Sequence, residues 1–148
     1  MKAILYPSKK RHAMDHFETV KQYLLELEAD ITTEIPESEL IIISLPSKGI
    51  HDMILDCEGD VLVLEQIIIP IREERPEYYQ RLLQINRTLI HGAFVLNDSQ
   101  DFPIIAFRDT LQLPNLDLNE LEGTFNALTF ALVENMDTLL ELSGQASA

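Results

Sequence analysis

A chain of 148 residues with 46% hydrophobic and 24% charged residues is expected to form one globular domain, and this balance excludes a disordered or fibrous protein. Eleven basic and 25 acidic residues give a net charge of −14, which opposes binding to the phosphate backbone of a nucleic acid. A single cysteine excludes an intrachain disulfide. No apolar run reaches the roughly 18 residues of a membrane-spanning helix, so we expect a cytoplasmic protein without membrane contact.

The charge is unevenly distributed along the chain. Lys2, Lys9, Lys10 and Arg11 precede the first acid, Asp15, so the remainder holds 7 basic and 25 acidic residues, a net charge of −18. Such a surface either keeps the protein soluble or attracts basic protein segments. We divide the chain into a basic segment over residues 1–12, one domain over 13–144 and a short tail over 145–148.

The first half of the chain predicts one helix and then three strands. Apolar residues at spacings of three and four, such as Phe17, Val20 and Leu24, predict an amphipathic helix from about 13 to 29. Strands are predicted over 39–45, 50–57 and 61–69, with tight turns between them. The third strand is apolar almost throughout, which predicts a central strand covered on both faces.

The second half predicts a helix, a hairpin and a long final helix. Pro76 can begin the first of these helices, which we expect to end at Gly92 in the C′ position. The hairpin strands are predicted over 93–96 and 104–113. Asp117 with Glu120, or Asn119 with Glu122, provides a capping-box-like start for the last helix, and Gly144 a stop. The order α-β-β-β-α-β-β-α predicts an α+β fold with three helices on a mostly antiparallel five-stranded sheet.

Residues that could carry chemistry form no recognisable site. His12 and His16 have the i,i+4 spacing of a metal pair, but no third ligand is evident. The acidic turn DCEGD, residues 56–60, imitates the start of a calcium loop without the bidentate Glu at its twelfth position, and a solvated hairpin turn explains it better. Cys57 lies between two acids and is expected to be a buried, inert thiol. We therefore expect no enzyme, no cofactor and no metal.

The predicted elements carry more apolar surface than one face of a sheet requires. Residues 61–69 and the helix from about 77 to 91 are apolar on more than one side. Asn86 is expected at the border between the apolar and polar faces of that helix. The surplus is explained by a homodimer contact, by a groove for another protein, or by helices that wrap both faces of the sheet.

The segments LLQINRTLIHGAFVLND, residues 82–98, and FRDTLQLPNLDLNELEGTFNALTFALVENMDTLLEL, residues 107–142, resemble the YbjN family. That family is similar in turn to the type III secretion chaperones of the Tir-chaperone (CesT-like) type, and the likeness covers about residues 14–142. The resemblance implies a small acidic α+β domain that forms a homodimer and, in the secretion branch, holds an extended client segment on its apolar patches. It implies no catalytic residue.

The resemblance also implies that the second helix forms much of the dimer contact. The candidate residues for a dimer or partner interface are Tyr78, Leu82, Ile85 and Leu89. The candidate residues for a client or packing surface are Val61, Val63 and Ile67.

Three classes of function remain open. The leading hypothesis is a non-enzymatic, chaperone-like homodimer that binds protein segments. The second is a regulatory or scaffold subunit with one fixed partner. The third is an unrecognised enzyme, which requires a deep polar pocket with at least two ionisable groups of perturbed pKa.

Overall fold

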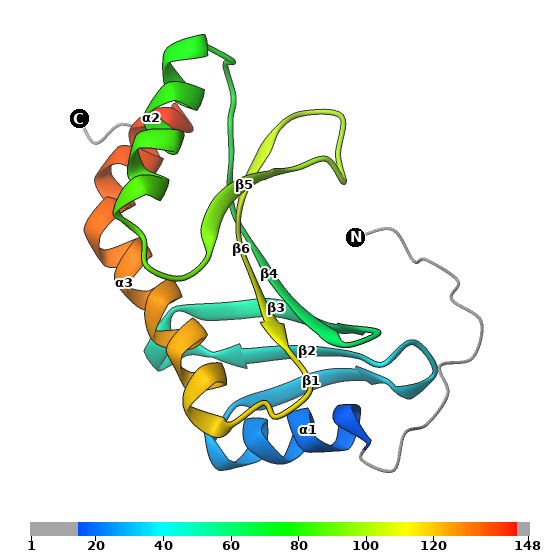
Figure 1. Cartoon of the computed structure of the whole chain (residues 1–148). Coiled ribbons are helices and arrows are strands. Elements are labelled where there is room, and N and C mark those ends of the chain that lie inside the picture. The colour runs from blue at the N-terminus through cyan, green and yellow to red at the C-terminus, as the bar shows by residue number, and fades with distance from the viewer. Residues whose placement is uncertain (1–14, 145–148) are drawn as a thin grey trace.

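Three α-helices lie along one side of a strongly curved antiparallel sheet in the computed structural model, which describes residues 15–144 (Figure 1). The helices and strands follow in the order α1 His16–Glu26, β1 Asp30–Ile35, β2 Leu40–Leu45, β3 Ile50–Glu58, β4 Val61–Pro70, α2 Pro76–Thr88, β5 Ala93–Asn97, β6 Ile104–Gln112 and α3 Leu118–Leu142. The sheet has the order β1-β2-β3-β4-β6-β5, and every neighbouring pair is antiparallel.

The described sheet has six strands, so the prediction of five strands was wrong. The missed strand is β1, which has the sequence DITTEI and lies at one edge of the sheet, paired with β2 alone. Five of its six residues are exposed. An edge strand with so little buried surface shows no alternation of apolar and polar residues, and that alternation is the signal by which strands are found in a sequence.

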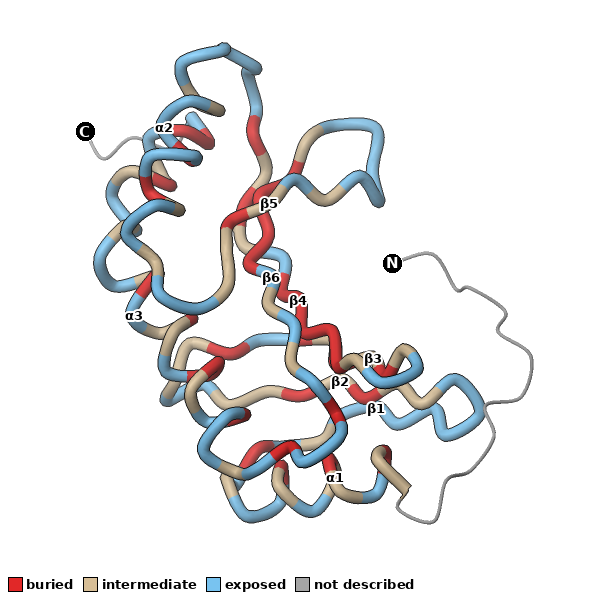
Figure 2. The backbone as a smooth tube through the Cα atoms, viewed as in Figure 1, coloured by how far each residue is buried: buried red, intermediate tan, exposed pale blue. Residues whose placement is uncertain are grey.

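Strand β4 is central, as predicted, because β3 and β6 flank it. Its alternate residues Leu62 and Leu64 join the core, which lies between the sheet and the helices. Figure 2 shows the buried stretches concentrated in β4, β6 and the inner sides of the helices. Residues 62–66 of β4 are buried on both faces, since Val63 and Glu65 are buried as well, but the described helices pack against only one of these faces. The alternative in which helices wrap both faces is thereby excluded for residues 15–144.

The connection from α2 to β5 differs from the prediction. Helix α2 begins at Pro76 as expected but ends at Thr88, and Leu89 is already extended. Gly92 therefore lies beyond the C′ position, in a connecting loop, with a φ of +72°. A Cβ atom at residue 92 would overlap the ring of Phe107. The glycine is thus required by the close approach of this ring and by its left-handed backbone rather than by the end of the helix.

Both ends of α3 match the prediction. Asp117 caps the helix, its side chain accepting from the Glu120 N–H at 2.8 Å while the Glu120 carboxylate accepts from the Asp117 N–H at 3.3 Å. Gly144 has a φ of +79° directly after the C-cap residue, Ser143. Helix α1 begins after Asp15 and ends at Glu26, three residues before the predicted end, and residues 13 and 14 lie outside the described part.

Candidate protein-binding surfaces

The four candidate interface residues, three on α2 and Leu89 directly after it, hold this helix against its own sheet. Leu82, with 5% of its surface exposed, and Ile85 are buried in the core, and Tyr78 and Leu89 are half-buried against it. The next residue, Leu83, is 71% exposed and points away from the core. A charge at Leu82 would therefore disturb the protomer itself, whereas Leu83 can make contacts outside it.

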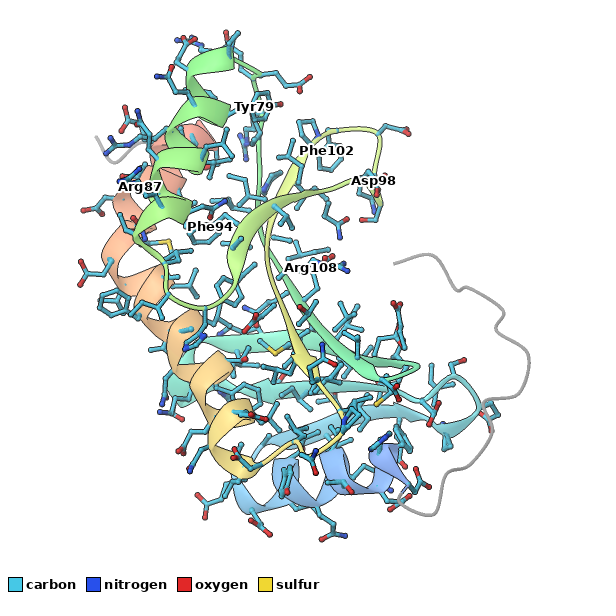
Figure 3. All side chains as sticks on the ribbon, in the orientation of Figure 1. Tyr79, Arg87, Phe94, Asp98, Phe102 and Arg108 are labelled. Atoms are coloured by element: carbon cyan, nitrogen blue, oxygen red, sulfur yellow. The ribbon has the colours of Figure 1, made fainter. Side chains whose placement is uncertain are left out.

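A cleft of about 290 Å³ lies between α2 and β5, and we call it the α2–β5 cleft. Its lining residues are Tyr79, Leu82, Leu83, Asn86, Phe94, Val95 and Leu96. Leu96 is exposed at its rim, and Phe94 lies on the helix side of the sheet (Figure 3). Within residues 15–144, strand β5 is an edge strand that pairs with β6 alone. The cleft therefore combines apolar side chains with the free edge of a strand, which is a combination that favours protein contacts.

Asn86 is half-buried between buried Ile85 and exposed Arg87, which agrees with the expected border position, and its amide also pairs with the edge of β5. Its Nδ2 donates to the Phe94 carbonyl at 2.9 Å, and its Oδ1 accepts from the Phe94 N–H at 2.7 Å. The side-chain amide thus imitates the backbone of a next strand at one position. Residues i and i+2 of a strand direct their backbone groups to the same side, so the N–H and C=O of Leu96 face the same open edge.

A longer groove runs along α3, and we call it the α3 groove. Its apolar part, of about 370 Å³, is lined by Thr88, Leu89, Ile90, His91, Gly123, Asn126, Ala127 and Phe130. Its second part, of about 460 Å³, exposes more apolar than polar surface, and we call it the polar part after its mostly polar residues, which are His91, Thr110, Leu111, Gln112, Asp117, Asn119, Glu120, Gly123 and Thr124. The two parts meet at His91 and Gly123, which line both. Sequence reasoning missed this groove because its residues come from segments that are distant in the chain.

The open face of the sheet carries a polar cluster in an apolar setting. Glu65 is buried, and its carboxylate accepts from Arg108 Nη1 at 3.2 Å and from Asn97 Nδ2 at 2.6 Å. Arg108 points away from the helices (Figure 3). Each oxygen of this carboxylate has a donor, so the cluster neutralises a buried charge. The sequence signal that could have revealed it is the lone acid within VLVLEQIII.

The candidate residues of β4 lie on this open face. Val61, Val63 and Ile67 alternate with Leu62 and Leu64, which belong to the core. Val63 is buried between neighbouring strands, Val61 is half-buried and Ile67 is exposed. Exposed apolar surface is thus smaller on this face than along α2 and α3.

The resolved pKa shifts belong to surface pairs. A hydrogen bond from Tyr79 to the Glu74 carboxylate raises the pKa of Tyr79 to about 12. Glu34 raises the pKa of Lys21, and Glu73 raises the pKa of Arg75. These residues do not line the α3 groove.

The candidate metal and thiol residues form no cluster in the part of the chain that the structure describes. His12 lies outside it, and no group of three or more His, Cys, Asp or Glu side chains within 15–144 is placed to hold a metal ion. Cys57 is buried, as predicted. No described helix is both long and apolar enough to cross a membrane.

Comparison with known proteins identifies both a family and a fold. The model of the CesT_Tir_1 family matches residues 13–145. One similar structure is that of YbjN from E. coli, which is named as a candidate transcription regulator. Its sequence is 14% identical to this chain, the TM-score is 0.61, and the match covers 83% of this chain and 92% of that one. A protein from Methanothermobacter thermautotrophicus is 15% identical to this chain with a TM-score of 0.61, and the match covers 85% of this chain and 97% of that one.

The fold is also that of a protein in a chaperone complex. A chain of the HopA1-SchA chaperone-effector complex is 11% identical with a TM-score of 0.57, over 90% of this chain and 99% of that one. No curated protein sequence matches the chain. At these identities the structural likeness shows a shared α+β, type III secretion chaperone-like fold, as the sequence resemblance implied.

Proposed function

The chain belongs to the CesT_Tir_1 family, and we propose from this that it is a non-enzymatic, chaperone-like protein of the cytoplasm that holds a segment of a partner protein as a homodimer. The proposal assigns this role to one domain over residues 13–144, preceded by the basic segment 1–12 and followed by the tail 145–148. The family's chaperone type, and the fold shared with a chain of a chaperone-effector complex, support the binding of a protein.

The main observation in support of a homodimer is the exposed apolar rim of the α2–β5 cleft. Leu83 and Leu96 are large apolar side chains on either side of this cleft, one from the helix and one from an edge strand. In a symmetric dimer the same patch of both copies meets, so one apolar cleft with a free strand edge can bury itself against its copy. Leu82 forms the floor of the cleft, and the other three candidate residues, Tyr78, Ile85 and Leu89, support the helix from inside.

The partner segment is assigned to the surface that dimerisation leaves free. Of the candidate residues on the open sheet face, Ile67 is exposed and Val61 half-buried, while Val63 is buried beside the neutralised Glu65 and supports this surface from below. The strongly acidic composition favours a partner segment that is basic as well as apolar.

The mass in solution tests the dimer, measured by light scattering coupled to size exclusion over a wide range of concentrations. We expect twice 16.9 kDa for the natural chain. Leu83→Asp should give the mass of one chain, because it places a charge in the proposed apolar contact between the two copies. The variant should remain folded, because Leu83 is exposed in the single chain. Leu25→Asp is the matched control, since Leu25 is exposed on α1, away from the cleft, and should leave the dimer intact. A folded monomer at every concentration of the natural chain would overturn the homodimer.

A regulatory or scaffold subunit with one fixed partner is the alternative that a pull-down distinguishes. A single stoichiometric complex would favour it, whereas several weakly bound clients would favour the chaperone-like role. Direct control of transcription through DNA is opposed by the net charge of −14.

A further inference from the structure

The α3 groove changes its chemistry along its length. Its polar part lies at the beginning of α3, where Asp117 and Glu120 line it. Its apolar part follows along the helix, with Ile90 90% exposed and Phe130 58% exposed at its edges. Gly123 lies between the two parts, and no atom is within 4 Å of the place where its Cβ would be. A segment that fits this groove has basic residues at one end and large apolar residues at the other.

The charge around the groove favours a basic occupant. Helix α3 contains five acidic residues and no Lys or Arg, and Glu122 and Glu134 are exposed beside Gly123 and Phe130. One ammonium group already contacts the groove, because Lys48 Nζ donates to Asn126 Oδ1 at 2.7 Å. Exposed acids thus flank both parts of the groove, and Asp117 and Glu120 add two carboxylates at the polar end, so a segment with several cations is attracted most strongly to that end.

The chain itself contains a segment of this composition. Residues 1–12 read MKAILYPSKKRH, with Ile4, Leu5 and Tyr6 followed by the basic run at residues 9–11 and without any acid. We propose that residues 1–12 dock in the α3 groove of the same chain, with the apolar residues in its apolar part and the basic run against Asp117 and Glu120.

The length of the segment and the position of α1 allow this arrangement. Tyr23 Oη donates to the Leu116 carbonyl at 3.0 Å, which places the last turns of α1 beside the start of α3. The path back along α1 from Asp15 to Tyr23 is about 12 Å, and the path along α3 from Asp117 to Phe130 is about 20 Å. The 14 residues before Asp15 can span roughly 46–50 Å. The basic run, which is nearer to Asp15, reaches the acidic end first, and the apolar residues reach the apolar part.

Photo-crosslinking of the full chain tests the proposal directly. Tyr6 is replaced by the photoreactive residue p-benzoylphenylalanine, the sample is irradiated, and cross-linked peptides of the monomer band are identified by mass spectrometry. We expect cross-links to the segments around Leu89 and Ile90 and around Ala127 and Phe130. Cross-links mainly to the open sheet face or the α2–β5 cleft, only between two chains, or none at all would each overturn the proposal.

A pair of variants on one helix separates docking from non-specific cross-linking. Phe130→Asp removes an apolar contact of the groove and should lower the yield of cross-links from residue 6 to the groove about tenfold. Val133→Asp introduces the same charge at a residue that is 74% exposed and does not line the groove, so its yield should stay unchanged. Equal loss in both variants would contradict docking in the groove. The analysed band contains only single chains, so its cross-links lie within one chain. The result therefore does not depend on whether the chain dimerises through the α2–β5 cleft.

Discussion

At the scale of single residues, Asn86 shows how one amide can replace part of a strand. Its two hydrogen bonds to the Phe94 backbone join α2 to the edge of β5. In the sequence, only its apolar neighbours indicate the environment of Asn86. From them we predicted that Asn86 lies at the border between the apolar and polar faces of α2. The pairing with Phe94 depends on the path of the loop at residues 89–92, which no local pattern indicates.

The pairing predicts the effect of removing the amide. Asn86→Ala leaves the N–H and C=O of Phe94 without these partners, and we expect the free energy of unfolding to fall by about 1–3 kcal/mol. Gln80→Ala is the control, because Gln80 is exposed on the same helix and should change this free energy little. Urea denaturation followed by circular dichroism measures both variants. Equal stability of the two would show that the Asn86 amide adds nothing to the fold.

At the scale of elements, the helices and most strands follow from apolar periodicity and capping residues. Pro76 and the Asp117–Glu120 capping box mark the starts of α2 and α3 correctly. Strand β1 was missed because an exposed edge strand lacks the alternating pattern. The end of α2 was wrong because Gly92 was assigned to a helix stop, whereas tertiary packing against Phe107 requires it.

Two glycine variants separate backbone strain from packing in these connections. Gly59 and Gly92 both have a positive φ, but a Cβ at 59 meets no atom within 4 Å while one at 92 meets the Phe107 ring. Gly59→Ala should cost about 1–2 kcal/mol, from the left-handed backbone alone. Gly92→Ala should cost about 1–3 kcal/mol more, because the ring must move. Thermal unfolding at matched concentration measures the difference, and similar losses would mean that the Phe107 ring adapts without cost.

At the scale of the whole molecule, the three helices cover one face of the sheet and leave three surfaces for contacts. These surfaces are the α2–β5 cleft, the α3 groove and the open sheet face. The three most exposed large apolar residues, Leu83, Ile90 and Val133, lie on α2, on the loop between α2 and β5, and on α3. This distribution fits contacts with other proteins better than a buried pocket for a small molecule.

A homodimer predicts that stability depends on protein concentration. If only the folded chains associate, raising the concentration tenfold should raise the Tm of the natural chain by about 2 °C. Leu83→Asp should remove this dependence, because its folded form is expected to be a monomer. Scanning calorimetry at two concentrations measures both. A Tm of the natural chain that does not change with concentration would contradict the α2–β5 contact.

The sequence by itself determined the α+β class, the family resemblance, the central position of β4 and the limits of α3, because apolar periodicity, turns and caps are local properties. Only the tertiary structure decided that Leu82 and Ile85 face inward while Leu83 faces outward, and that Glu65 meets Arg108 and Asn97. It also decided that segments near residues 90 and 123 form one groove. These features depend on pairings between distant parts of the chain, and a linear pattern of residue types does not contain the geometry of such pairings.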